Sequence, residues 1–116
     1  MYISMLNNRS AVANANYLEI LLMDLQKSLV RDPSIRLADC VANEVNRTLG
    51  LKKRHLQYAP FYVLAKTKMP AILVETAFIS NPHEEKLLHS PDFREQMAEA
   101  IFAGVKDYGR EVLASR

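Results

Sequence analysis

Apolar residues recur at helical spacing between residues 17 and 29 and predict the first helix. The recurring positions include Leu21 and Leu25, so one face of this helix is apolar. Leu18 and Leu22 widen the apolar face beyond a single stripe. The pattern therefore indicates a helix that is covered on more than one side.

A second helix is predicted over residues 33–49. Asp32 and Pro33 mark its start, because Asp accepts a hydrogen bond from a free backbone N–H and proline suits the first helical position. Apolar residues then follow at alternating steps of three and four, at Ile35, Ala38, Ala42, Val45 and Leu49. Gly50 is expected to end this helix, as a C-terminal glycine often does.

Two strands are predicted after a basic turn. Residues 61–64 are rich in β-formers, and residues 71–74 form a continuous apolar run, as in strands that are covered on both faces. Only about five residues separate the two strands, too few for a parallel crossover, so we expect an antiparallel hairpin within a mixed sheet. Residues 2–5 are compatible with a further short strand.

Two capped helices are predicted at the end of the chain. Asn81 caps the first, Pro82 follows it, and Glu84 is placed to complete a capping box with Asn81. Ser90-Pro91 starts the second helix. Its expected core-facing stripe consists of Phe93, Met97, Ala100, Ile101, Gly104 and Tyr108.

The predicted order of elements is helix, helix, strand, strand, helix, helix. This order favours the α/β class, with helices packed on a mixed β-sheet. The length of 116 residues suits a single domain over residues 1–116.

Composition and charge narrow the classes of function. The charged fraction of 24% and the apolar fraction of 49% are ordinary for a globular protein, and the net charge of +2 is small. Basic residues are spread along the chain apart from the short run at 52–54, so we expect no nucleic-acid partner. No segment approaches the ~20 apolar residues of a membrane span, and the first ten residues lack the features of a signal peptide.

Glu75 is the residue that the pattern of strands does not explain. It follows the apolar run at 71–74, where ligands gather at the carboxyl ends of strands in α/β sheets. An ionised carboxylate at a sheet rim is costly unless it is paired, metal-bound or functional. A solvated or salt-bridged glutamate and a functional one both fit the position.

The longer segment MPAILVETAFISNPHEEKLL, residues 69–88, bears on that choice. It resembles the zinc-dependent N-acetylmuramoyl-L-alanine amidases that cut bacterial peptidoglycan, in which a strand is followed by V-E-T-G/A-F-I-S-N. The segment KKRHLQYAPFYVL, residues 52–64, is similar to a K-x-R…A-x-F-x-V-L segment of the same family. The resemblance covers roughly residues 17–108 and implies the C-terminal portion of a three-layer α/β catalytic domain, incomplete in this chain.

The resemblance also implies roles for two residues. Glu75 corresponds to the catalytic glutamate, a general base in cleavage of the amide between N-acetylmuramic acid and L-alanine. Arg54 aligns with an arginine of the family, for which substrate binding and an ordinary surface position are both open.

Zinc is the cofactor that the resemblance implies for the intact enzyme. The family binds it through two histidines and a glutamate on earlier strands, in motifs that have no counterpart here. His55, His83 and His89 show no metal-ligand spacing that replaces them. We therefore expect no metal site in this chain alone.

The resemblance leaves several expectations on partners, place and function. Peptidoglycan is the expected substrate, in the periplasm or the cell wall. Half a sheet exposes an edge, which predicts self-association or a separate N-terminal half. Some members of the family carry an inserted helix that an activator protein displaces, and residues 11–29 are either the tail of such an insert or a core helix. The alternative to an enzyme is a non-catalytic truncated fragment, or a binding module of the same fold.

Overall fold

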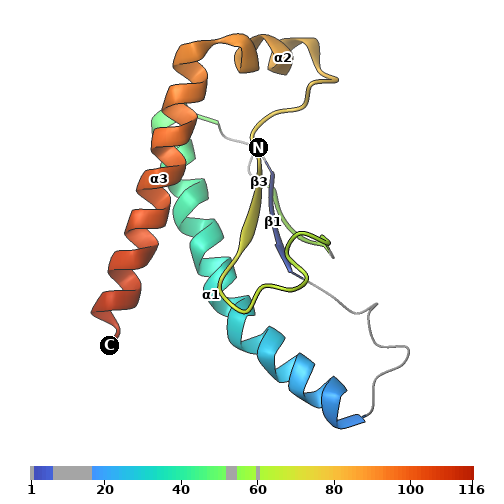
Figure 1. Cartoon of the computed structure of the whole chain (residues 1–116). Coiled ribbons are helices and arrows are strands. Elements are labelled where there is room, and N and C mark those ends of the chain that lie inside the picture. The colour runs from blue at the N-terminus through green and yellow to red at the C-terminus, as the bar shows by residue number, and fades with distance from the viewer. Residues whose placement is uncertain (1, 7–16, 52–54, 60) are drawn as a thin grey trace.

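The computed structural model describes residues 2–6, 17–51, 55–59 and 61–116 (Figure 1). Six elements follow one another in these ranges. They are β1 (Tyr2–Leu6), α1 (Tyr17–Leu49), β2 (His55–Ala59), β3 (Ile72–Glu75), α2 (Pro82–His89) and α3 (Pro91–Ala114). None of the described helices is long and apolar enough to cross a membrane.

The first long helix is continuous where the sequence predicts two. α1 runs through Pro33, so the predicted start at Asp32 is wrong. Pro33 has no N–H to donate to the carbonyl of Leu29, four residues earlier, so one hydrogen bond of the helix is missing. The next residue, Ser34, adds a side-chain hydrogen bond at this point. The Ser34 hydroxyl donates to the Val30 carbonyl oxygen at 2.6 Å. Gly50 ends α1 with a φ of +63°, which confirms its predicted role, because glycine adopts this conformation without steric cost.

The three strands form one sheet in the order β2-β1-β3. β1 is central and pairs in parallel with β2 and antiparallel with β3. The predicted short strand near the N-terminus is therefore present, and the strand predicted at 71–74 is present as β3. The predicted hairpin is wrong, because β1 lies between the two later strands.

The strand predicted at residues 61–64 is also wrong. The backbone there forms successive turns, in which Leu64 N–H donates to Phe61 O at 3.0 Å and Ala65 N–H donates to Tyr62 O at 3.2 Å. The strand lies earlier, at β2, where β1 supplies a partner in parallel register from Tyr2 opposite His55 to Leu6 opposite Ala59. Pairing with a distant segment, rather than local β-propensity, sets the position of this strand.

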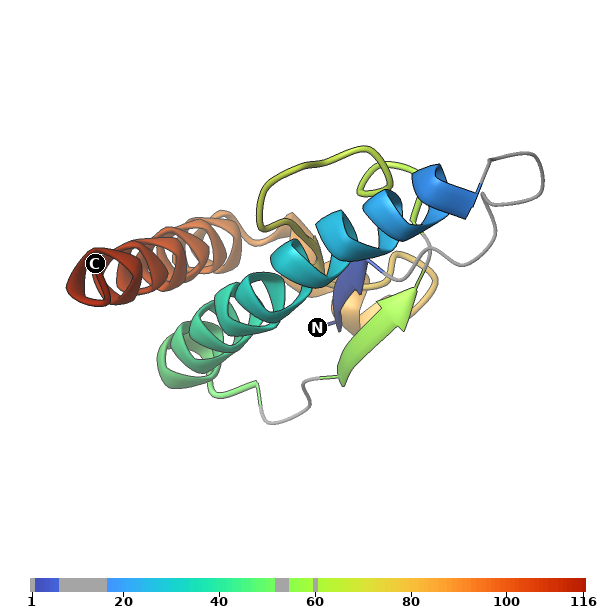
Figure 2. The ribbon, with the colours of Figure 1, turned by 90° about the horizontal axis from the view of Figure 1, so that it is seen from below.

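The core lies between α1, α3 and the sheet. α1 packs against β1 and β3, and α3 packs along α1 (Figures 1 and 2). The buried core consists of Ala38, Val41, Ala42, Val45, Met97 and Ala100. Phe93 and Ile101 pack against this cluster, and Gly104 is buried, so these members of the predicted stripe of α3 face inward as expected.

Candidate functional site around Glu75

Glu75 is the last residue of β3 and lies opposite Tyr2 in the antiparallel pairing with β1. Ile72 and Val74 of the same strand pack against the core, which fixes the backbone that leads to Glu75. Because β3 is antiparallel to β1, and β1 is parallel to β2, the carboxyl end of β3 lies at the amino-terminal edge of β1 and β2. At the edge of the sheet where Glu75 lies, only β3 of the three described strands has its carboxyl end, so the rule that ligands bind at the carboxyl ends of strands covers β3 but not β1 or β2.

The Glu75 carboxylate makes no hydrogen bond or ion pair within the described part of the chain, and its residue is half-buried. The salt-bridged alternative from the sequence thus has no partner among the described residues. A half-buried carboxylate with no partner among the described residues is open to a water molecule or a ligand.

The turn after Glu75 is closed by hydrogen bonds. Asn81 N–H donates to Phe78 O at 3.1 Å, and Phe78 N–H donates to the Glu84 carboxylate at 2.7 Å. The Asn81 side chain accepts from His83 N–H at 3.0 Å and from Glu84 N–H at 3.4 Å, so Asn81 caps α2 as predicted. The predicted capping box is wrong, because the Glu84 side chain binds Phe78 instead of the N–H of Asn81.

The second predicted site residue is Arg54, and the three histidines are the remaining residues that the sequence analysis considered as metal ligands. Arg54 lies outside the described residues, as does the side chain of His55. His83 is exposed in the first turn of α2. His89 is exposed at the end of α2, with its Nε2 atom 3.8 Å from the Glu85 carboxylate.

The described residues do not fit a zinc site. They contain no group of three or more His, Cys, Asp or Glu side chains placed to hold a metal ion. Structural and catalytic zinc sites use three or four such ligands.

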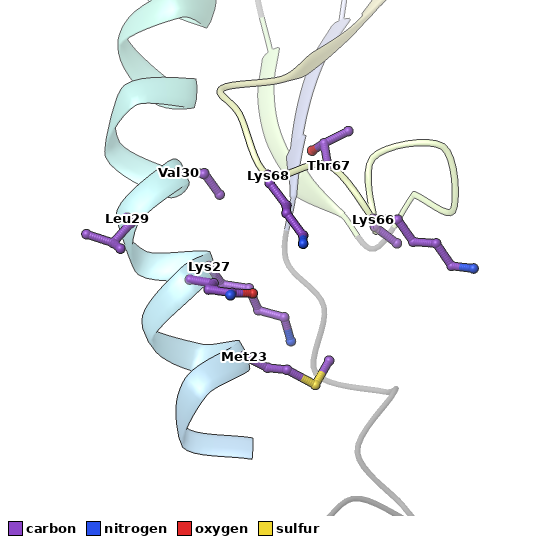
Figure 3. Close-up of a pocket in the computed structure, with 9 residues that line it drawn as sticks. Met23, Lys27, Leu29, Val30, Lys66, Thr67 and Lys68 are labelled. Carbon is purple, nitrogen blue, oxygen red and sulfur yellow. The ribbon is translucent and has the colours of Figure 1, made fainter. Parts of the chain in front are cut away.

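A hollow of about 460 Å³ lies elsewhere, between α1 and residues 65–68 (Figure 3). Its lining includes three lysines, Lys27 from α1 and Lys66 and Lys68 from a second, distant segment, and no shared motif predicts it. The lysine side chains do not converge, since Lys66 points away from Lys68 in Figure 3. The hollow shares no residue with the turn that follows Glu75.

Comparison with known proteins decides the family. Residues 1–107 match the sequence profile of the N-acetylmuramoyl-L-alanine amidases. The chain belongs to the N-acetylmuramoyl-L-alanine amidase family. The matched range contains β3, Glu75 and the hydrogen-bonded turn, so the site described above lies inside the amidase region.

Individual amidases show how much of the family the chain covers. It is 44% identical over 108 residues to N-acetylmuramoyl-L-alanine amidase AmiC of Neisseria meningitidis, covering 88% of this chain and 26% of that protein. It is 34% identical to amidase AmiA of Escherichia coli, covering 86% of this chain and 35% of that protein. The chain thus spans about a quarter to a third of these amidases.

A solved amidase structure has a similar fold. Amidase AmiC2 of Nostoc punctiforme superposes with a TM-score of 0.63 and 36% identity, over 68% of this chain and 44% of that one. The likeness agrees with the α/β class.

Proposed function

We propose that this chain supplies the part of a peptidoglycan amidase that carries the catalytic glutamate. The whole of residues 1–116 is assigned to one catalytic domain. The substrate is the amide that joins the lactyl group of N-acetylmuramic acid to L-alanine, in the periplasm or cell wall. The three-layer arrangement of the intact domain is part of this proposal.

Glu75 is the proposed general base. Its carboxylate takes a proton from the attacking water, the carbonyl carbon gains the oxygen, the C–N bond breaks, and the proton passes to the leaving amine. The observation that carries this role is the half-buried carboxylate at the end of β3, without a protein partner among the described residues. Strand pairing with β1 on one side and the closed turn on the other hold its backbone in place.

Other parts of an intact enzyme complete the site. The resemblance implies a zinc ion. We propose that its ligands are residues other than those that the structure describes. Arg54 is proposed to contact the substrate, and an activator protein is proposed as a regulator of the intact enzyme.

A chimeric enzyme tests this proposal. This chain replaces the matching segment of Neisseria meningitidis AmiC, to which it is 44% identical, and release of peptide from purified peptidoglycan is measured. The chimera is expected to be active. Glu75→Gln in the chimera keeps the shape of the side chain but removes the base, so turnover is expected to fall by about 10²-fold or more.

A matched substitution and a metal measurement make the result specific. Glu99→Gln removes the same charge from an exposed position on α3 and is expected to leave turnover unchanged. Zinc content of the Glu75→Gln chimera is expected to equal that of the parent chimera, because Glu75 is not assigned as a ligand. Near-normal turnover of the Glu75→Gln chimera would contradict the role of Glu75, and a folded, inactive parent chimera would favour the non-catalytic alternative.

A further inference from the structure

Four leucines on the first turns of α1 face solvent and form a stripe. Leu18, Leu22, Leu25 and Leu29, here called the leucine stripe, are 66%, 58%, 58% and 67% exposed. They follow one another at steps of four, three and four, which is the spacing of the a and d positions of a coiled coil. Exposed apolar side chains that line up on one face of one element form a contiguous surface of the kind that partners cover.

The leucine stripe is not the core face of its helix. Ile20, Met23 and Val30 lie on other positions of the same turns and are half-buried, and Ser34 is buried. The helix is therefore apolar on two sides, but the expectation that it is covered on more than one side is wrong for this structure. The structure covers one side and leaves the other in solvent.

The stripe continues a helix–helix interface that is already present. Arg36 follows Leu29 by one heptad, so it lies on the same side of α1. There it binds Glu111 near the C-terminal end of α3, with both nitrogen–oxygen distances at 2.6 Å. α3 ends at Ala114, and the N-terminal turns of α1 extend away from that end (Figures 1 and 2). α3 thus covers this side of α1 near Arg36 but does not extend to the leucine stripe, which is exposed to solvent.

The steps between the four leucines are the same whether they are counted from Leu18 or from Leu29. Steps of four, three and four place a two-fold axis midway between Leu22 and Leu25. An identical helix laid antiparallel on the stripe brings Leu18 against Leu29 of the second copy, and Leu22 against Leu25 of the second copy. Such a contact is isologous and closes with two copies.

Charge at the edges of the stripe does not oppose this pairing. The positions that flank the seam are occupied by Glu19, Leu21, Gln26 and Ser28. Only Glu19 carries a charge, and an antiparallel partner places Gln26 of the second copy beside it. No pair of like charges faces across the two-fold axis.

We propose that a second copy of this chain docks antiparallel on the leucine stripe through its own stripe. The two helices bury four leucines from each copy in a seam about 16 Å long. An interface of this size is at the low end for specific complexes, so we expect a dimer with a Kd on the order of 10–100 µM. The inference is independent of the proposed catalytic role of Glu75.

Sedimentation equilibrium of the full 116-residue chain tests the dimer. The weight-average mass is expected to rise from one chain towards two between roughly 5 and 500 µM. The double variant Leu22→Glu/Leu25→Glu is expected to remain a monomer over the same range. The matched control Phe102→Glu/Val105→Glu places two charges on the exposed face of α3, at residues 66% and 48% exposed, and is expected to dimerise as the parent does. A parent that stays monomeric, or a control that also loses the dimer, would overturn the proposal.

Cysteine cross-linking tests the orientation without disrupting the seam. In a Cys40→Ala background, Leu18→Cys chains mixed with Leu29→Cys chains are expected to form a mixed disulfide under mild oxidation. Antiparallel pairing puts these two positions opposite each other, whereas a disulfide needs Cα atoms within about 7 Å, so positions at opposite ends of the seam cannot be joined. Preferred cross-linking of Leu18→Cys chains with one another indicates a parallel pair and would overturn the antiparallel arrangement.

Discussion

A β-carbon on Gly104 would lie 2.4 Å from the Cα atom of Val41 and 2.8 Å from its backbone nitrogen. The backbones of α1 and α3 are therefore in direct contact where the two helices cross. No side chain fits between them, and backbone atoms on the opposite side cannot turn away as a flexible side chain does. The two longest helices can therefore cross this closely only because Gly104 has a hydrogen atom in place of a side chain.

Gly104→Ala is expected to destabilise the protein. The added methyl group forces the helices apart in a packed core, which typically lowers the free energy of unfolding by about 1–3 kcal/mol. Gly109→Ala is the matched control, because it lies in the same helix with nothing within 4 Å of an added β-carbon. That control is expected to raise the free energy of unfolding by about 0.5–1 kcal/mol. Urea unfolding measures both, and equal effects would contradict the close approach.

Ser34→Ala is expected to weaken the link between α1 and the segment that leads into β3. The buried Ser34 hydroxyl accepts from Ala71 N–H at 3.0 Å while it donates to the Val30 carbonyl. Its removal leaves the Ala71 N–H without this acceptor, at a cost of about 1–3 kcal/mol. Ser28→Ala removes an exposed hydroxyl that, among the described residues, bonds to Leu25 O within its own helix, and should change stability by less than about 0.5 kcal/mol. Similar losses in the two variants would show that the contact with Ala71 contributes nothing.

Glu84→Ala is expected to loosen the turn that follows Glu75. Phe78 N–H loses the carboxylate 2.7 Å away, so its amide should exchange with solvent roughly tenfold faster. Glu84→Gln retains an acceptor oxygen and should give an intermediate rate. Glu85→Ala, one residue along the same helix, is the control and should leave Phe78 unchanged. Hydrogen exchange by NMR resolves these amides, and an unchanged rate in Glu84→Ala would exclude the bond.

Glu111→Gln is expected to lower stability at neutral pH and to have little effect in acid. The hydrogen bonds from Arg36, and then its positive charge, hold the pKa of the Glu111 carboxyl below its ordinary value of 4.5. A lowered pKa in the folded protein stabilises it above the ordinary pKa, and this contribution disappears as the pH falls through the folded-state value.

Thermal unfolding from about pH 7 down to about pH 2.5 measures this contribution. The parent and Glu111→Gln melting temperatures should converge at the acid end. Both residues are exposed, so the difference at pH 7 should be small and should shrink in high salt. Glu99→Gln serves as the charge control. A difference that persists unchanged in acid would show that the effect is not electrostatic.

Local chemistry explains which elements the sequence predicts correctly. Asn81 and Ser90 cap α2 and α3 through side-chain bonds to backbone groups two or three residues away, and Gly50 closes α1 within one turn. These signals act between near neighbours, so their meaning does not depend on the rest of the fold.

Long-range contacts explain the wrong predictions. Asp32-Pro33 has the signature of a helix start, but the segments before and after it are both helical and join in one helix. The Ser34 hydroxyl bonds to the Val30 carbonyl and so bridges the two segments. Residues 61–64 have β-propensity, but β1 pairs with residues 55–59 instead. Glu84 has capping-box spacing, but the Asn81 N–H is already bound to Phe78 O, which leaves the carboxylate for Phe78 N–H.

The candidate site was predicted only in part. The position of Glu75 at the end of a strand follows from the apolar run before it, and the structure confirms it. Its place at the amino-terminal edge of β1 follows from strand order, which no local pattern encodes. The three lysines around the hollow come from two separate segments and had no shared motif.

The central place of β1 in the sheet has a consequence for biosynthesis. Its first partner, β2, begins at His55, 49 positions after β1 ends at Leu6. At about 5–20 residues per second, the ribosome delivers that partner several seconds later, and β3 later still. α1 needs only neighbouring residues and can form in that interval, whereas β1 can pair with β2 and β3 only after residues 55–75 have been made. The contacts that close this sheet therefore form later in synthesis than the helix that packs against it, so the order of synthesis favours the helix before the sheet.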